Sequence, residues 1–392
     1  MMKKRAALML ILLLCLPLMT GCGGGREIDK SLFVLALAVD PAEGGGLTVT
    51  VKALSGSQEA TGSGQGSGED DERSGGATEE TEPGYIVMSA TSTSCLRAMS
   101  LLSATTPRTL DLSQLREVVV SRTIAETDAT LTILREIYSM FNANGAAVVV
   151  VTPNVAGDFI RKQKPALGVR LSQHLDVLFS HFAELDTIPT DTTLSSVISA
   201  MESSICDATA VYAADNDYEN TLVLPGDEDL NRLPGHLPRT APTEGEYLGA
   251  ALFSGPRMTG VLTGDETTLL NILLGTTTRE IRIIDGAQYK ANGKARAKRS
   301  ISKEDGALEV SVTMSLTQIG GDRRHTALEL SAQLEREMAE LIARLQAAGS
   351  DAGCFGHYAV RRFLDVPSWK AYDWQSAYEN APVRVTAKVR VL

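Results

Sequence analysis

Continuous and alternating apolar segments organise the N-terminal part of the chain. Residues 32–39 form an unbroken apolar run that ends at Asp40 and Pro41, as expected of a buried strand. Residues 47–54 alternate apolar and polar positions, which predicts a half-buried strand that forms a hairpin with the first. Further strands are predicted at residues 85–89, 115–121 and 146–151, and the last is fully apolar and therefore expected to be central.

Helical spacing of apolar residues marks several segments between and after these strands. Apolar residues recur every third or fourth position in residues 91–103 and along one face of residues 126–141. Shorter helices are predicted at residues 155–162, 171–182 and 194–201. Strands that alternate with helices indicate a mixed α/β domain, with a sheet covered by helices.

The C-terminal part has a different order of elements. Strands that follow one another directly favour antiparallel pairing, so this part is predicted to be an antiparallel-sheet α+β domain with flanking helices. The fold class is therefore α+β and multidomain. The predicted strands are residues 247–253, 258–262, 280–284, 289–302, 308–319 and 383–391, and the predicted helices are residues 264–274, 326–348 and 354–362.

Two shifts in composition divide the chain. Residues 55–84 hold eight acidic residues against Arg73 alone and almost no large apolar residue, which predicts a disordered acidic loop. Residues 215–245 are rich in turn residues and contain four prolines. The expected parts are an N-terminal mixed α/β domain (31–165), a middle helical region and linker (166–246), and a C-terminal α+β domain (247–392).

The N-terminus has the pattern of a secreted lipoprotein. Three basic residues precede an apolar stretch, residues 6–19, that is shorter than the roughly 20 residues a bilayer span requires. Such a stretch is typical of a signal peptide. Leu18-Met19-Thr20-Gly21-Cys22 resembles a lipobox, which implies removal of residues 1–21 and lipid on the Cys22 thiol. Residues 22–30 then form a tether. An ordinary signal peptide cut elsewhere is the alternative.

Composition narrows the class of protein. The 392 residues are 43% apolar and 22% charged, as in ordinary globular proteins, and the net charge of −11 gives no reason to expect nucleic acid binding. Three cysteines remain if residues 1–21 are removed and Cys22 is lipidated: Cys95, Cys206 and Cys354. Buried free thiols are the favoured interpretation, because free cysteine packs as a small apolar residue, and one disulfide is the alternative.

We find no motif for catalysis, metal or cofactor binding in the sequence. His174 and His181 share one predicted helix face, but zinc would need further ligands, so both are interpreted as ordinary core or surface histidines. Carboxylates near the first strand are interpreted as strand-end and surface charges. A C-terminal aromatic cluster is interpreted as core rather than interface, and it consists of Trp369, Tyr372, Trp374 and Tyr378.

Several segments together resemble the Ger(x)C family, the lipoprotein C subunits of spore germinant receptors. The resemblance runs in order over nearly the whole chain after Cys22. It rests on Arg26-Glu27-Ile28-Asp29 before the first strand, on residues 247–253 and 258–262 followed by Asp265-Glu266, and on Gly353-Cys354-Phe355-Gly356, Trp369-Lys370 and Trp374.

The resemblance implies three domains, each built on a sheet with flanking helices. It also implies a non-enzymatic subunit, lipid-anchored through Cys22 on the outer surface of the spore inner membrane, that acts with two integral membrane subunits, A and B, in the response to nutrients. A solute-binding lipoprotein of an ABC importer is the first alternative, and it predicts two lobes of alternating strands and helices. A lipid-anchored hydrolase is the second.

Overall fold

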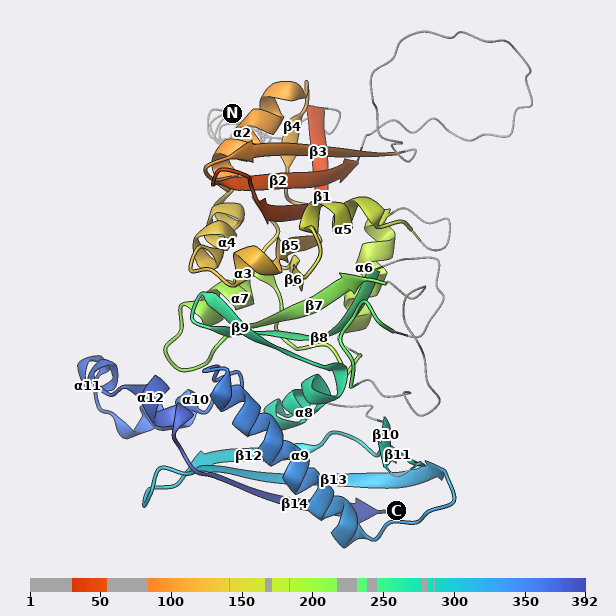
Figure 1. The fold of residues 1–392 in the computed structure, drawn as a ribbon, viewed down its shortest axis with the longest axis vertical. Coiled ribbons are helices and arrows are strands. Elements are labelled where there is room, and N and C mark those ends of the chain that lie inside the picture. The colour runs from red at the N-terminus through yellow and green to blue at the C-terminus, as the bar shows by residue number, and fades with distance from the viewer. Residues whose placement is uncertain are drawn as a thin grey trace, which may run out of the picture.

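The computed structural model describes residues 30–54, 84–140, 142–165, 171–182, 184–216, 231–237, 245–276, 281–284 and 286–392. Cys22 and its tether, apart from Lys30, lie outside these residues, as do residues 55–83 of the predicted acidic loop. Two sheets and their helices follow one another along the long axis of the molecule (Figure 1).

The first sheet is nine-stranded and mixed. Its order is β3-β2-β1-β5-β6-β7-β8-β9, with β4 paired to the start of β1. The neighbours β1, β5, β6 and β7 run parallel, and the pairs towards both edges are antiparallel. The strands are β1 (Ser31–Pro41), β2 (Leu47–Leu54), β3 (Tyr85–Ser92), β4 (Thr109–Asp111), β5 (Glu117–Ser121), β6 (Val148–Thr152), β7 (Thr209–Asp215), β8 (Gly245–Ser254) and β9 (Arg257–Leu262).

Helices cover both faces of this sheet. Because side chains alternate along a strand, Leu37 and Val39 of β1 face one side and Ala36 and Ala38 the other. The helices that pack on the first side are α2 (Cys95–Thr105), α4 (Thr130–Ser139) and α7 (Leu194–Met201), together with the short α3 (Arg122–Ala125). Those on the second side are α5 (Ala156–Lys162) and α6 (Leu171–Phe182).

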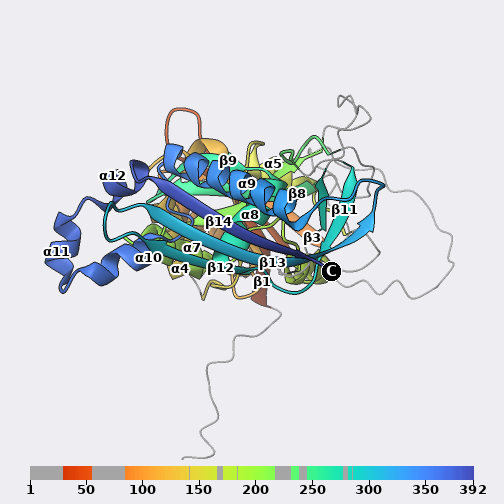
Figure 2. The same cartoon turned by 90° about the horizontal axis from the view of Figure 1, so that it is seen from below.

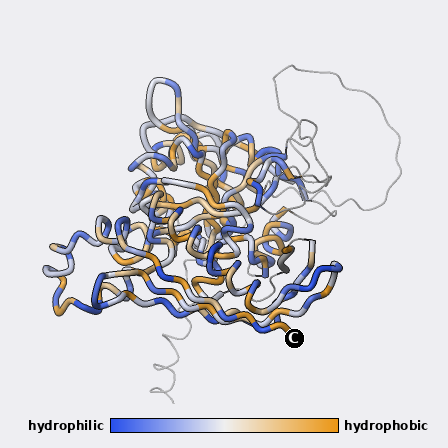
Figure 3. Tube along the Cα trace, turned by 60° about the horizontal axis from the view of Figure 1, so that its bottom comes forward, coloured by the Kyte–Doolittle hydropathy of each residue, from blue (hydrophilic) through white to orange (hydrophobic). Residues whose placement is uncertain are grey.

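The second sheet is five-stranded and centred on one long strand, β13 (Leu308–Gly320). One edge of β13 pairs antiparallel with both β11 (Ala287–Ala291) and β12 (Arg296–Ile301), and β10 (Ile281–Ile284) pairs with β11. The other edge pairs parallel with β14 (Val383–Val391). The strands show the expected alternation of apolar and polar residues (Figure 3).

Two helices fill the space between the sheets. Leucines of α8 (Gly264–Leu274) and α9 (Ala327–Ala347) share one apolar core with residues of β8, β9 and the inner face of the second sheet. Short helices then project to one side of the molecule (Figures 1 and 2). They are α10 (Gly356–Ala359), the 3₁₀ turn η4 (Val360–Arg362), α11 (Val366–Ala371) and α12 (Trp374–Glu379).

The α+β fold class is confirmed, and the structure differs from the expectation in several details. Strand β7 was not predicted; it pairs with β6 and β8, so the first sheet continues past residue 246. The predicted strand at residues 289–302 is divided into β11 and β12. The β13–β14 pair is parallel, because the connection through α9 returns the chain to the same end of the sheet. The resemblance implied three sheet-based domains, whereas the described residues form two sheets.

A disulfide joins the two sheet regions. The structure pairs Cys206 with Cys354, whose Cα atoms lie 4.4 Å apart, and leaves Cys95 free and buried. The prediction of three free thiols was therefore wrong for two of them. The physical reason is tertiary: the segment after α7 meets the segment before α10, although 148 residues separate the two cysteines.

A partly buried aspartate, Asp207, and a buried one, Asp351, lie at this junction. Asp207 accepts hydrogen bonds from the backbone N–H groups of Gly255 and Asp351. The Asp351 carboxylate orders its own side of the junction, where it accepts hydrogen bonds from the N–H groups of Phe355 and Gly356 and from the indole of Trp374. Burial raises the pKa of Asp351 to about 7 despite these donors.

Candidate functional site

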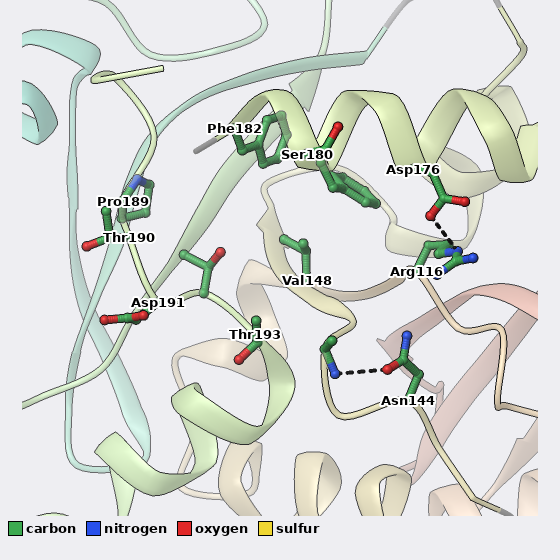
Figure 4. A pocket seen from close by; sticks show the side chains of 13 residues that line it. Arg116, Asn144, Val148, Asp176, Ser180, Phe182, Pro189, Thr190, Asp191 and Thr193 are labelled. Atoms are coloured by element: carbon green, nitrogen blue, oxygen red, sulfur yellow. Dashed lines mark hydrogen bonds and ion pairs between the residues drawn. The ribbon is translucent and has the colours of Figure 1, made fainter. Parts of the chain in front are cut away.

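A pocket of about 510 Å³ lies on the first sheet, where the N-terminal ends of β5 and β6 meet α6 and the segment before α7 (Figure 4). This volume is in the usual range for a small-molecule site. Segments far apart in sequence line it: Arg116, Asn144, Ala146, Val148, Asp176, Phe179, Ser180, Phe182 and residues 189–193.

An ion pair stands at one end of the pocket. The Nε atom of Arg116 lies 2.9 Å from Oδ1 of Asp176 on α6. The side chain of Arg116 is 26% exposed and that of Asp176 is 49% exposed, so water reaches both. The backbone of Arg116 is fixed on both sides, because its N–H donates to Leu35 and its carbonyl accepts from Val148. The sheet therefore fixes the backbone from which the guanidinium group extends, and Asp176 and Gln114 contact the group itself.

Hydroxyl groups and a carboxylate stand at the other end (Figure 4). Asp191 has a positive φ of 57°, which turns the chain between Thr190 and Thr192. The carbonyl of Thr192 accepts a hydrogen bond from Val149 on β6. The hydroxyl of Thr193 caps α7 by accepting the N–H of Ser196. This wall is thus held by the edge of β6 and the start of α7.

The remaining wall is apolar. Phe179 and Phe182 on α6 pack edge to face, with ring centroids 5.2 Å apart, and Val148 of β6 also lines the pocket. The ring of Tyr247 lies behind both phenylalanines, at 6.1 Å and 5.4 Å between centroids. The pocket therefore combines an apolar side with charged and hydroxyl groups, a combination that is common in small-molecule sites.

A buried charge cluster adjoins this wall. Glu117 is fully buried, and its carboxylate lies 3.5 Å from the hydroxyl of Tyr247. Burial raises the pKa of Glu117 to about 7, although Gln163 and the positive charge of Lys52 act in the opposite direction. Lys52 is 2% exposed and donates to the backbone carbonyls of Ile160 and Gln163. The cluster fixes the end of α5 against the sheet.

The residues singled out in the sequence are not part of this pocket. His174 is half-buried on α6, where burial lowers its pKa, and His181 lies on the exposed side of the same helix beside Glu184. Within the described part of the chain, one group could offer three metal ligands: Cys206, Cys354 and His357. Its two sulfur atoms are bonded to each other, so they are not thiolate ligands here.

The aromatic cluster was predicted to be core, and the structure bears this out for only part of it. Trp369 is 5% exposed and Tyr378 is fully buried, whereas Tyr372 is 41% exposed. The indole of Trp369 donates to the hydroxyl of Ser204, so the cluster packs against the segment that carries the disulfide. Cys22 lies outside the described residues, and its lipid remains a prediction.

The fold and the pocket define a two-sheet α+β protein with a ligand-sized pocket on its larger sheet. None of the helices in the described residues has the length and apolar character that a membrane span needs. Two family models match the chain in order: the spore germination protein N-terminal domain over residues 24–214, and the spore germination B3/GerAC-like C-terminal domain over residues 248–392.

The chain belongs to this spore germination family, that of the C subunits of germinant receptors. The resemblance seen in the sequence is confirmed. No curated protein matches the chain. One solved structure, "Crystal Structure of the GerBC protein", is similar to it with 12% identity and a TM-score of 0.47, over 91% of this chain and 96% of that one.

Proposed function

We propose that this protein is the lipid-anchored, non-enzymatic C subunit of a spore germinant receptor and acts beside two integral membrane subunits in the response to nutrients. The observation that carries the proposal is the ordered match of both family domains over nearly all of the chain. The predicted signal peptide and lipobox support lipid anchoring on the outer face of a membrane, and the family resemblance implies that this membrane is the spore inner membrane.

The position of the first strand supports this attachment. Strand β1, which begins at Ser31, lies in the upper part of Figure 1, and the second sheet lies at the bottom. Nine peptide units join Cys22 to Ser31, and such a chain spans about 30 Å at most. Lipid on Cys22 would therefore hold the first sheet next to the bilayer. Two acyl chains make such attachment stable, whereas one gives only marginal binding.

The test is to recover the protein from detergent-solubilised membranes of sporulating cells, with Cys22→Ala as the matched control. We expect two polytopic membrane proteins to copurify with the wild type and to be reduced in the control. Spores without the gene should lose the response to a nutrient and keep the response to a nutrient-independent trigger. Normal nutrient germination of such spores, in a strain with no second receptor, would contradict the proposal.

The same experiment decides the importer alternative, because an ABC importer would yield an ATPase and a permease instead. The architecture already disfavours it. A solute-binding protein of that kind needs two lobes of alternating strands and helices. Here the second sheet has antiparallel pairs on one edge of β13 and a single parallel pair on the other.

A further inference from the structure

The outward face of the second sheet is basic. Six exposed lysines and arginines project from it, and we call this set the basic face: Lys290, Arg296, Lys298, Arg384, Lys388 and Arg390. Successive side chains along a strand point to opposite faces of the sheet. The neighbours Ala291, Ala297 and Val389 pack in or against the apolar core, so the six cations point outwards.

Strand register places these cations in rows. Arg296 of β12 pairs with Thr313 of β13, and Thr313 pairs with Lys388 of β14. Lys298 continues the next row through Ser311. Seen from below, β12, β13 and β14 lie at the front of the molecule (Figure 2). Helix α9 packs on the inner face and along β14, so it leaves the basic face open.

Few acidic groups balance the basic face. Glu309 of β13 is the one carboxylate among the strand residues that share it, and it lies 3.9 Å from Arg384, which also pairs with Asp305. The other five cations make no ion pair with the part of the chain that the structure describes. This concentration of positive charge occurs in a chain whose net charge is −11. Such a local field attracts anionic partners and aligns them before contact.

The spacing of the cations suits an extended chain. Arg296 and Lys298, like Lys388 and Arg390, are two residues apart on one face, which is about 6.7 Å along a strand. An extended peptide repeats its side chains on one side at the same interval. Ser311, Thr313 and Ser315 between the cationic strands supply hydroxyl groups that donate to carboxylates.

The position of the basic face disfavours lipid headgroups as its partner. In the first sheet, β9 lies five strands from β1, or about 24 Å, and the layers of α8 and the second sheet add about 10 Å each. The tether of about 30 Å at most does not cover this distance. This step rests on the proposed lipid attachment at Cys22, whereas the charge of the face does not.

We propose that the basic face binds an extended acidic segment of a second protein on the side of the molecule away from the bilayer. Charge complementarity and the two-residue spacing of the cations select this partner. The interaction weakens as salt is added, because dissolved ions screen the attraction between solvent-exposed charges.

The test uses the full chain carrying Cys22→Ala, so that lipid cannot bind vesicles by itself. The probes are a labelled oligoglutamate of about 12 residues, which spans about 40 Å when extended, and phosphatidylcholine vesicles with or without phosphatidylglycerol. The variant R296E/K298E/K388E reverses three charges of the face. The matched control R97E/R336E/K370E reverses three exposed charges on α2, α9 and α11. Circular dichroism confirms that both variants fold.

We expect the oligoglutamate to bind the parent chain, to bind the face variant about tenfold more weakly or worse, and to bind the control variant nearly as well as the parent. Equal loss in both variants, or no binding at low salt, would overturn the proposal. So would binding to phosphatidylglycerol vesicles through the face without binding of the peptide. Because no partner subunit or spore is involved, these results are independent of the test of receptor function.

Discussion

At the scale of single residues, the buried carboxyl of Glu117 has an unusual pKa. Water is excluded from it, and burial raises its pKa from 4.5 to about 7. A group whose pKa rises on folding holds its proton more tightly in the folded state. It therefore favours folding below pH 4.5, and this contribution is lost as the pH rises through 7. Glu117 was not recognised in the sequence, because a single glutamate at a strand start gives no sign of burial.

We predict that Glu117→Gln removes this pH dependence. The free energy of unfolding of the variant, relative to wild type, should rise by up to about 3 kcal/mol between about pH 4.5 and about pH 7.5. Urea unfolding at several pH values measures it. Glu340→Gln, on the exposed side of α9, is the control and should follow the wild-type profile. A constant difference between the Glu117 variant and wild type would contradict the prediction.

Gly249 shows how one backbone position limits the choice of residue. Its φ of +83° favours glycine, and a Cβ atom there would collide with the carbonyl oxygen of Leu262 on the paired strand β9. Gly275 ends α8 with a similar φ of +78°, but no atom lies within 4 Å of the place that its Cβ atom would take. Substitutions at these two positions therefore distinguish the cost of backbone strain alone from the cost of strain combined with a steric collision.

We expect Gly275→Ala to lower the free energy of unfolding by about 1 kcal/mol, the usual cost of a left-handed alanine. Gly249→Ala should cost clearly more, by about 3 kcal/mol or enough to prevent folding, because β8 and β9 must separate. Thermal unfolding of both variants measures the difference. Equal losses would show that β9 shifts freely and that the collision is relieved.

At the scale of elements, local patterns predicted helices better than strand partners. Helices α6 and α7 begin and end where apolar spacing placed them, at residues 171–182 and 194–201. Strand β7 was missed because residues 209–215 are a short, alanine-rich run beside a turn-rich segment. This segment forms a strand because it pairs with β6 and β8, which are distant in sequence. The same holds for β14, whose alternation was clear but whose parallel partner was not.

The start of helix α9 is marked by a capping box, a local sequence pattern whose contribution to the free energy of unfolding can be measured. Thr326 accepts the N–H of Glu329, and the Glu329 carboxylate accepts the N–H of Thr326, which together form a capping box. We predict that Thr326→Ala lowers the free energy of unfolding by about 1 kcal/mol. Thr326→Ser keeps the hydroxyl and should cost much less. Urea unfolding of the two variants measures this, and equal losses would show that the cap contributes nothing.

At the scale of the whole molecule, the candidate pocket could not be read from the sequence. Its charged ends come from Arg116 before β5, Asp176 on α6 and Asp191 before α7, which only the tertiary fold brings together. None of these residues lies in a motif. The basic face could not be predicted from the sequence either. The cations of β12 and β14 form one surface only because both strands pair with β13.

The connection between the two sheets is the property that best tests the whole architecture. Cys206 belongs to the region of the first sheet and Cys354 to that of the second, and the Asp207 carboxylate accepts the backbone N–H of Asp351 across the same junction. Because the disulfide closes a loop of 148 residues, it should stabilise the folded chain by roughly 2–5 kcal/mol. We therefore predict that a reductant lowers the free energy of unfolding of the wild type by this amount.

The double variant C206S/C354S should have the lower stability with or without reductant, and Cys95→Ala should keep the wild-type response, because Cys95 is free. Urea unfolding with and without dithiothreitol compares the three proteins. If the second sheet unfolds separately from the first after reduction, the disulfide is what couples the two sheets. If both melt in one transition after reduction, the apolar core shared by β8, α8 and α9 is sufficient to couple them. A wild type that does not respond to reductant would show that Cys206 and Cys354 are not joined in solution.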